Sequence, residues 1–388
     1  MRKLFLLLAS ASLVACTSSE QVEQIILDAA TKHLTNQCAI IDEATTFINP
    51  KTFKGDTICY IPQDDWCSGF FPGTILQMYK LTGDSLWLER GLRYTEALDT
   101  IMNLKWHHDV GFMVMASYGQ AYNITGNPIY KDAIITAANS LATRFRPAAG
   151  VIQSWDEDRG WQGKRGWMCP TIIDNMMNIE LFFEASRLTG DTSYYKMAIS
   201  HADTTLLYHF RPDFSTYHVV DYDKVNGGVR SRCTAQGYAD ESCWSRGEAW
   251  ALYSYTMCYR YTKNEAYLKQ AKAIFEYIFN NSNLPYDLVP YWDFNAPNIP
   301  NDYRDASAAA VICSALYELS QWESTYINVA DRLLRSLATT KYLAEPGTNG
   351  NFLLKHCVGS IPHNSEIDVP LNYADYYFLE ALCRKMQQ

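Results

Sequence analysis

The sequence predicts an all-α protein folded as an (α/α)6 barrel, that is, a six-hairpin toroid with long loops at one mouth. A helix–turn–helix pattern recurs along the chain, and its helices alternate between amphipathic and almost fully apolar types. No β-alternation of comparable strength appears, although residues 219–220 and 289–291 are expected to form short strands. The 48% hydrophobic content is sufficient for a large core, so we expect one catalytic domain over residues 23–388.

The repeated pattern consists of a helix end, a tight Gly or Asn C-cap, an Asp, Asn or Ser start and a new helix. Its copies lie at residues 79–84, 122–127, 186–191 and 260–264, with a weaker copy at 319–322. Outer helices are expected to start near residues 23, 85, 128, 192, 265 and 323. Inner helices are expected to start near residues 68, 111, 171, 245, 305 and 371.

The connections predict where a functional site lies. Turns from inner to outer helices are short, whereas most outer-to-inner connections run to about 20–35 residues, and loops of that length are usually functional. Because the inner helices run parallel, their N-termini and most of the long loops meet at one mouth. Converging helix N-termini create a positive field there that suits an anion.

Polar and aromatic residues open the inner helices at this mouth. They include Asp65, Trp66, His107, His108, Asp109, Asp174, Asn175, Trp244, Arg246, Glu248, Trp250, Arg304, Asp305, Asn372 and Tyr373. Helix capping explains the acids taken singly, with Asp109 and Asp305 as N-caps and with capping boxes at residues 171–174 and 245–248. Capping does not explain the Trp and His residues at the same mouth. The alternative to capping is that the carboxylates carry out acid/base chemistry on a polar ligand. Burial would raise the pKa of Asp174 and the helix dipole would lower it, and the sequence does not decide between them.

Composition excludes several other classes of function. The net charge of -9 argues against nucleic acid as the main partner. We expect no metal site, because there is no paired Cys-x-x-Cys spacing and the adjacent residues His107, His108 and Asp109 rarely ligate one ion. No Gly-x-Ser-x-Gly nucleophile elbow is present. The 27 Tyr and 10 Trp fit either stacking against sugar rings or packing in the core.

The N-terminus predicts export and a lipid anchor. Arg2 and Lys3 precede an apolar stretch over residues 4–15, which is too short to span a bilayer, and Cys16 follows it. This pattern resembles a bacterial lipobox, so residues 1–22 are predicted to be a lipoprotein signal peptide and tether, with Cys16 lipidated. An ordinary signal peptide with a chance cysteine is the alternative. We expect attachment in the bacterial cell envelope through this anchor alone, and the lack of an acidic run after Cys16 favours the periplasm-facing side of the outer membrane.

Eight short motifs combine the mouth residues and extend over most of the mature chain. They are residues 66–73, 108–112, 173–176, 216–218, 236–240, 244–250, 305–310 and 375–382. Together they resemble glycoside hydrolase family 88, the unsaturated glucuronyl hydrolases. Glu248 departs from the pattern, which commonly has Gln there, as do Cys67 and Cys243, where Ser- or Thr-like residues are common.

The resemblance implies an enzyme that uses no cofactor, needs no oligomer and hydrates the C4=C5 bond of a 4,5-unsaturated glucuronic acid. Its substrates would be polysaccharide-lyase products, namely disaccharides from chondroitin, hyaluronan or heparin. Asp174 would protonate C4 and then activate water, and Asp109 would be the second carboxylate. The substrate contacts that the resemblance implies are Trp66, His108, His218, Gln236, Trp244, Arg246 and Trp250.

Three alternatives stay open at this point. They are an unsaturated rhamnogalacturonyl hydrolase of family 105 acting on pectin fragments, a non-catalytic glycan-binding lipoprotein, and an inverting glycosidase of the same fold. Five cations in the long loops are candidates for contacting sulfate groups, although a solvated surface accounts for most of them. They are Lys164, Arg165, Arg230, Arg232 and Lys355.

Overall fold

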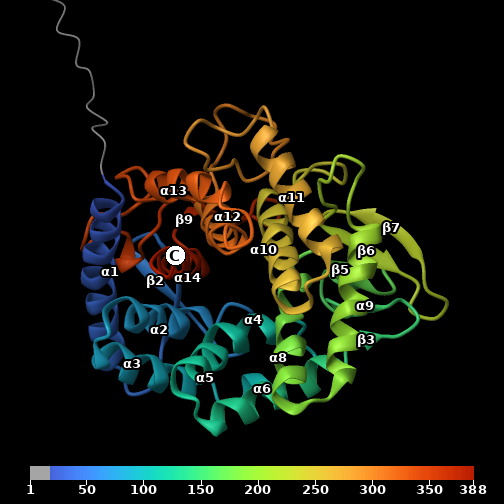
Figure 1. The fold of residues 1–388 in the computed structure, drawn as a ribbon, viewed down its shortest axis with the longest axis horizontal. Coiled ribbons are helices and arrows are strands. Elements are labelled where there is room, and N and C mark those ends of the chain that lie inside the picture. Colours follow the sequence, from blue (N-terminus) through green and yellow to red (C-terminus); the bar gives the residue numbers. More distant parts are fainter. Residues whose placement is uncertain (1–17) are drawn as a thin grey trace, which may run out of the picture.

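The computed structural model describes residues 18–388, and within that range two concentric sets of helices form an (α/α)6 barrel (Figure 1). The outer helices are α1 (Ser19–Asp42), α3 (Ser85–Glu96), α6 (Pro128–Ala142), α9 (Thr192–Tyr208), α11 (Glu265–Asn280) and α13 (Tyr326–Leu337). The inner helices are α2 (Phe70–Thr82), α4 (Val110–Val114), α5 (Gln120–Thr125), α7 (Asn175–Asn178), α8 (Glu180–Thr189), α10 (Ser245–Thr262), α12 (Ala306–Leu319) and α14 (Asn372–Lys385). A π-helix, η2 (Met115–Gly119), joins α4 to α5, and α7 and α8 together fill one inner position.

The inner helices form a closed ring. Helix α2 contacts α14, which contacts α12, and the ring continues through α10, α7 and α4 back to α2 by way of η2. Every residue of α12 is buried, because this helix is enclosed by α10, α14 and the outer helix α13. The predicted pairing of apolar inner helices with amphipathic outer helices is therefore confirmed.

Side chains in the short turns determine where the helices end and begin. Gly83, Gly126 and Gly190 end inner helices with a positive φ, which glycine adopts without the steric cost of a Cβ atom. The residue directly after each of these glycines is an Asp or Asn whose side chain accepts a hydrogen bond from the first turn of the outer helix, as Asp84 does from the Leu86 N–H at 2.9 Å.

Four helix ends differ from the prediction, and one of them is the start of α7, which begins at Asn175 rather than near residue 171 because Pro170–Ile172 form β5. Helix α1 begins at Ser19, where Ser18 and Gln21 form a capping box, so residues 19–22 belong to this helix rather than to the tether. Lys263, rather than Asn264, takes the left-handed conformation after α10, because Asn264 caps α11. Helix α13 starts at Tyr326, three residues after the predicted position.

The long outer-to-inner connections fold into small sheets and 3₁₀ turns. The strands are β1 (Asn49–Lys54), β2 (Thr57–Ile61), β3 (Phe145–Arg146), β4 (Val151–Ile152), β5 (Pro170–Ile172), β6 (Val219–Tyr222), β7 (Val229–Cys233), β8 (Cys357–Ser360) and β9 (Ser365–Val369). The 3₁₀ turns are η1 (Ile101–Asn103), η3 (Gln162–Lys164) and η4 (Asn349–Asn351). Strands β5, β6 and β7 form an antiparallel sheet in which Thr171 pairs with Val220, and the other strands form two-stranded hairpins.

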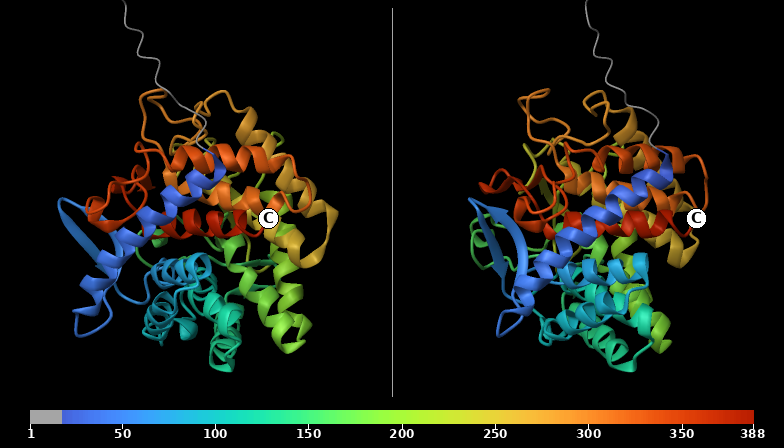
Figure 2. Two further views of the ribbon diagram at one scale, coloured as in Figure 1. Left: turned by 60° about the vertical axis from the view of Figure 1, so that its left-hand side comes forward. Right: turned by 90° about the vertical axis from the view of Figure 1, so that its left-hand side faces the viewer.

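The strand expected at residues 219–220 is thus confirmed, whereas the one at 289–291 is wrong. Tyr291 makes only an isolated bridge to Arg304, flanked by hydrogen bonds from the Trp292 N–H to the Tyr303 carbonyl and from the Asp305 N–H to the Pro290 carbonyl. Figure 2 shows the β1–β2 hairpin at one end of the barrel and the C-terminus of α14 at the other. The long connections therefore gather at the mouth where the inner helices begin.

No helix in the described part of the chain combines the length and the apolar character needed to cross a bilayer. Cys16, the predicted site of lipidation, lies outside the described residues.

Candidate active site

A cavity of about 310 Å³ opens at the mouth formed by the N-termini of the inner helices. Six of the predicted site residues line it, and they are Trp66, His108, Asp109, Asp174, Gln236 and Arg246. Asp109 precedes α4 and Asp174 precedes α7, so neighbouring inner helices place both carboxyl groups in this cavity. Gly111 permits the close approach of the two helices, because a Cβ atom there would lie 2.5 Å from the Asn178 Cα.

The Asp109 side chain is held by one hydrogen bond and lies beside His108. The Asn178 side-chain amide donates a hydrogen bond to Asp109 Oδ1 at 3.0 Å, and His108 Nε2 lies 3.2 Å from Asp109 Oδ2. Burial, together with the nearby Asp174 carboxyl group, raises the pKa of Asp109 to about 8 against the bond from Asn178, which acts to lower it. Asp109 therefore favours its neutral form near pH 7.

Asp174 occupies the N-cap position of α7, yet its side chain makes no capping hydrogen bond. The predicted capping box with Thr171 is wrong, because Thr171 lies in β5 and pairs with β6. Burial raises the pKa of Asp174 to about 7, and Arg246 and the nearby Trp250 indole act to lower it. This carboxyl group can hold a proton near neutral pH and release it without a large energetic cost, as a general acid must.

His218 faces Asp174 from the β5–β6–β7 sheet. Its Nδ1 accepts hydrogen bonds from the Ala235 and Gln236 backbone N–H groups, both at 3.0 Å, so the ring proton of the neutral imidazole is on Nε2. Burial lowers the pKa of His218 to about 3, which keeps the ring neutral. Its Nε2 lies 3.7 Å from Asp174 Oδ2, so the N–H group can stabilise a carboxylate at that position.

Arg246, in the first turn of α10, is a buried cation at the cavity wall. It forms an ion pair with Asp305 at 3.0 Å and donates hydrogen bonds to the Val358 and Gly359 carbonyl groups of β8. Asp305 also caps α12 by accepting a bond from the Ser307 N–H at 3.0 Å, as predicted. The predicted capping box at Ser245 is wrong, because Ser245 Oγ donates to the Tyr291 carbonyl.

The other predicted contacts lie behind the first layer of cavity residues. The Trp244 ring packs against His218 with ring centres 4.8 Å apart, and the Arg246 guanidinium lies 4.6 Å from the Trp244 ring centre. Trp250 is fully buried and packs on Phe112 with ring centres 5.1 Å apart. Trp244 and Trp250 therefore support the residues that line the cavity rather than lining it themselves.

Sequence reasoning missed several lining residues. They include Lys51, Trp155, Trp161, Gln162, Ser360, His363, Ser365 and Glu366. These residues come from long connections and the β8–β9 hairpin, where no helical period marks which side chains face inward. The high Trp content of residues 155–167 was the one available signal.

The five cations proposed for sulfate lie outside the set of residues that line this cavity in the described structure. Arg230 pairs with Asp221 at 2.5 Å, and Arg165 lies over the Trp161 ring at 5.6 Å from its centre. Lys51, which was not predicted, is a lining cation and pairs with Glu366 at 3.0 Å.

A metal could contact His107, His108 and Asp109, whose potential ligand atoms lie within 4.8 Å of one another. His107 Nδ1, however, accepts a hydrogen bond from the Asp109 backbone N–H at 3.1 Å. A metal at that nitrogen would displace this bond, so the donor set fits a hydrogen-bonded loop better than an ion.

Comparison with known proteins agrees with this geometry. Residues 42–382 match the model of Glycosyl Hydrolase Family 88. An unsaturated glucuronyl hydrolase from Formosa agariphila is 44% identical over 345 residues, which cover 88% of this chain and 85% of that protein. An unsaturated chondroitin disaccharide hydrolase from Streptococcus pyogenes is 31% identical over 349 residues, covering 87% of this chain and 85% of that protein.

Solved structures show the same likeness. The crystal structure of an unsaturated glucuronyl hydrolase specific for heparin has a TM-score of 0.89 and 42% identity, and the match covers 94% of this chain and 98% of that one. The enzyme from Bacillus sp. GL1 has a TM-score of 0.84 and 28% identity, covering 95% of this chain and 97% of that one. Fold, site and sequence thus agree, and the chain belongs to Glycosyl Hydrolase Family 88.

Proposed function

We propose that the protein hydrates the C4=C5 double bond of a 4,5-unsaturated glucuronic acid at the non-reducing end of glycosaminoglycan disaccharides. The observation that carries this proposal is the pair of buried carboxyl groups, Asp109 and Asp174, whose pKa values are raised to about 8 and about 7 in one cavity. The names of the similar proteins, which include glucuronyl and chondroitin disaccharide hydrolases, support the substrate class.

Asp174 is the proton donor in this proposal. The substrate is an enol ether, so transfer of the Asp174 proton to C4 leaves an oxocarbenium-like cation at C5. The Asp174 carboxylate then takes a proton from a water molecule that attacks C5, which restores the acid. The resulting hemiketal opens, and the bond to the second sugar breaks without direct displacement at the glycosidic carbon.

Two neighbours assist Asp174. The Nε2–H group of His218 lies near Asp174 Oδ2 and stabilises the carboxylate that proton transfer produces. Asp109, oriented by Asn178, contacts sugar hydroxyl groups. Because Asp109 lies near Asp174, a negative charge on one of the two carboxyl groups disfavours ionisation of the other.

Lys51 and Arg246 supply positive charge for the uronate carboxylate. Both line the cavity, and each is anchored by an acid, Glu366 or Asp305, so their positions are set before substrate binds. Trp66 and Trp155 offer ring faces for the sugars in the same cavity.

Turnover of a substrate panel tests this function. Unsaturated disaccharides from chondroitin, hyaluronan, heparin and pectin are incubated with the enzyme, and loss of the ultraviolet absorbance of the double bond is followed. We expect turnover of glycosaminoglycan products and its loss in Asp174→Asn. Turnover of the pectin product alone, or a wild-type rate for Asp174→Asn, would refute the proposal.

Glu248→Gln is the matched control variant. Glu248 is a second buried acid whose pKa burial raises to about 7, but it accepts a hydrogen bond from the Thr216 N–H behind the cavity. A glutamine oxygen can accept the same bond, so this variant should keep most of the activity. Its result separates loss of the proton donor from a general effect of removing a buried carboxyl group.

We further propose that a lipid on Cys16 attaches the enzyme to the cell envelope, facing the periplasm. The lipobox-like sequence before Cys16 supports this location.

A further inference from the structure

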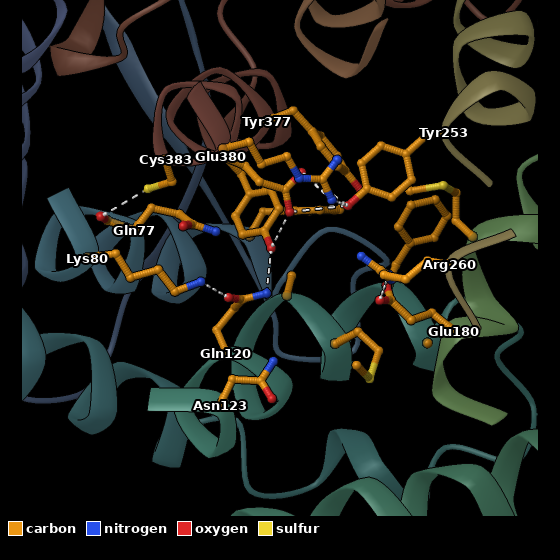
Figure 3. A pocket seen from close by; sticks show the side chains of 18 of the residues that line it. Gln77, Lys80, Gln120, Asn123, Glu180, Tyr253, Arg260, Tyr377, Glu380 and Cys383 are labelled. Carbon is orange, nitrogen blue, oxygen red and sulfur yellow. Dashed lines mark hydrogen bonds and ion pairs between the residues drawn. The ribbon is translucent and has the colours of Figure 1, made fainter. Parts of the chain in front are cut away.

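A second cavity of about 310 Å³ lies at the opposite mouth, where the inner helices end (Figure 3). Helices α2, α5, α8, α10 and α14 contribute side chains to it. Phe112 lines both this cavity and the active-site cavity, and it packs against Phe70 and Trp250 with ring centres 5.9 and 5.1 Å away. An aromatic layer therefore separates two chambers inside the barrel. We call the second one the lower chamber.

Gln77 is the first sign that the lower chamber binds a ligand. Its side chain is 1% exposed, and neither the amide nitrogen nor the amide oxygen has a hydrogen-bond partner among residues 18–388. Figure 3 shows this amide extending from α2 toward the middle of the chamber. A buried amide without partners is costly, so a molecule in the chamber that both donates and accepts hydrogen bonds would relieve that cost.

Lys80 is the second sign, and it is independent of Gln77. The two arginines of the chamber are neutralised, since Arg260 pairs with Glu180 and with Glu318 at 3.2 Å, and Arg384 pairs with Glu318 at 2.8 Å. The Lys80 ammonium donates to the neutral Gln120 amide, and no carboxylate of the described chain lies within ion-pair distance of it. Lys80, an exposed residue, is thus the chamber cation that makes no ion pair within residues 18–388, and Glu380, which pairs with Arg384 at 3.7 Å, is the chamber acid that acts on it from farther away.

We propose that the lower chamber binds a small hydroxylated carboxylate of the sugar-acid class. Its carboxylate would pair with Lys80, and a hydroxyl group would bond to the Gln77 amide. Tyr253, Tyr377 and Met177 give the apolar walls against which the C–H face of a sugar packs. The volume lies at the lower end of the range of about 300–1,000 Å³ for ligand pockets, which suits one sugar unit rather than an oligosaccharide.

Calorimetric titration of the full chain with D-glucuronate, and with D-glucose as its neutral counterpart, tests this site. The wild type is compared with Gln77→Leu and Lys80→Met. Gln270→Leu is the matched control, because Gln270 is a buried glutamine of α11 with an unpartnered amide nitrogen that lies outside the chamber. Removing either chamber group should weaken glucuronate binding by about tenfold or more, and the control should not change it.

The outcomes distinguish this site from the active site at the other mouth. Binding to the active site alone would be equal in the wild type, Gln77→Leu and Lys80→Met, and that result would overturn the proposal. Absence of glucuronate binding, or equal binding of glucose, would also overturn it. Gln77→Leu removes two unpaired polar atoms, so its melting temperature without ligand should be at least that of the wild type. Lys80→Met, at the rim of the chamber, tests the site independently of any effect of Gln77→Leu on folding. None of these binding results depends on the reaction proposed above.

Discussion

At the scale of single residues, burial outweighs the helix dipole at Asp174. The carboxyl group is at the N-cap of α7, where the dipole favours a negative charge, yet its pKa is raised to about 7. It gains no capping hydrogen bond that would hold it ionised. Desolvation is therefore the larger effect, and it makes a capping residue into a candidate acid.

The first prediction concerns the pH dependence of turnover. The proton donor must be protonated in the free enzyme, so kcat/KM should fall as the pH rises above about 7, where Asp174 loses its proton. Asp174→Asn should lower kcat by about 10²–10⁴-fold. Rates on an unsaturated disaccharide measured from pH 5 to about 9 check this. A profile that stays flat through the neutral range would contradict the assignment.

Asp174→Asn, which should lower the activity, should not lower the stability of the fold at alkaline pH. The pKa of Asp174 is raised on folding, so the folded state loses stability relative to the unfolded state as the pH rises from the unfolded pKa toward about 7. Asn cannot ionise, so Asp174→Asn should be at least as stable as the wild type at pH 8. Urea unfolding at pH 5 and 8 measures this, and a variant less stable at pH 8 alone would count against the raised pKa.

Asn178 is a positioning residue in our interpretation, and it carries the second prediction. Its amide donates to Asp109 Oδ1 and its oxygen accepts from the Phe112 N–H at 2.8 Å. Removal of the donor in Asn178→Ala should raise the pKa of Asp109 above about 8 and move a second titration of the pH–rate profile, at about 8, upward, whereas the limb that Asp174 sets near pH 7 should stay in place. A loss of activity with an unchanged profile would indicate a purely structural role.

At the scale of elements, Arg246 joins three segments that are distant in sequence. It lies on α10, its ion-pair partner Asp305 precedes α12, and its hydrogen-bond acceptors Val358 and Gly359 lie in β8. The β8–β9 hairpin in turn provides Ser360, Ser365 and other residues to the cavity. The ion pair therefore holds one wall of the active site against the barrel.

The third prediction follows from the burial of that pair, whose side chains are 2% and 0% exposed. Asp305→Asn can still cap α12, but it leaves a buried guanidinium without its counter-charge. The free energy of unfolding should fall by about 3–5 kcal/mol. The control is Glu241→Gln, which removes an exposed partner of Arg211 at 3.3 Å and should cost less than about 1 kcal/mol. Equal effects in denaturant titrations would disprove a special role for the Arg246–Asp305 pair.

At the scale of the whole molecule, the two mouths of the barrel have different chemistry. The mouth with the inner-helix N-termini combines long connections, aromatic side chains and the carboxyl pair. The other mouth has short turns and contains the lower chamber with the paired charges around Arg260 and Arg384. A direct consequence is that the long loops can vary the substrate contacts without disturbing the helical ring.

The fourth prediction concerns the attachment of the whole molecule to a membrane. Cys16 follows an apolar segment in a lipobox-like sequence, and a lipid there would anchor the enzyme. Cys16→Ser, expressed in a bacterial host, should move the protein from the membrane fraction to the soluble fraction while its activity persists. Detection of both fractions by immunoblot checks this, and unchanged membrane association would rule out the anchor at Cys16.

Much of the architecture could be predicted from the sequence because it depends on local signals. Glycines after the inner helices, Asp or Asn caps before the outer helices and the apolar character of helices such as α12 are visible in the chain itself. These signals placed Asp109 and Asp174 at helix starts on one mouth. They misplaced the start of α1, where the capping box of Ser18 and Gln21 begins the helix about one turn earlier, and the start of α13, which has no side-chain cap.

The site could be predicted only in part, because many of its contacts join residues far apart in the chain. The sequence by itself determined the ring of paired helices, the mouth with the long loops and the two acids, since helix periodicity and capping are local. Only the tertiary structure decided that Thr171 lies in a strand, that Trp250 supports the wall, and that Lys51 and the β8–β9 hairpin line the cavity. It also decided that Asp174 binds its proton near pH 7, because desolvation depends on what surrounds a carboxyl group in space.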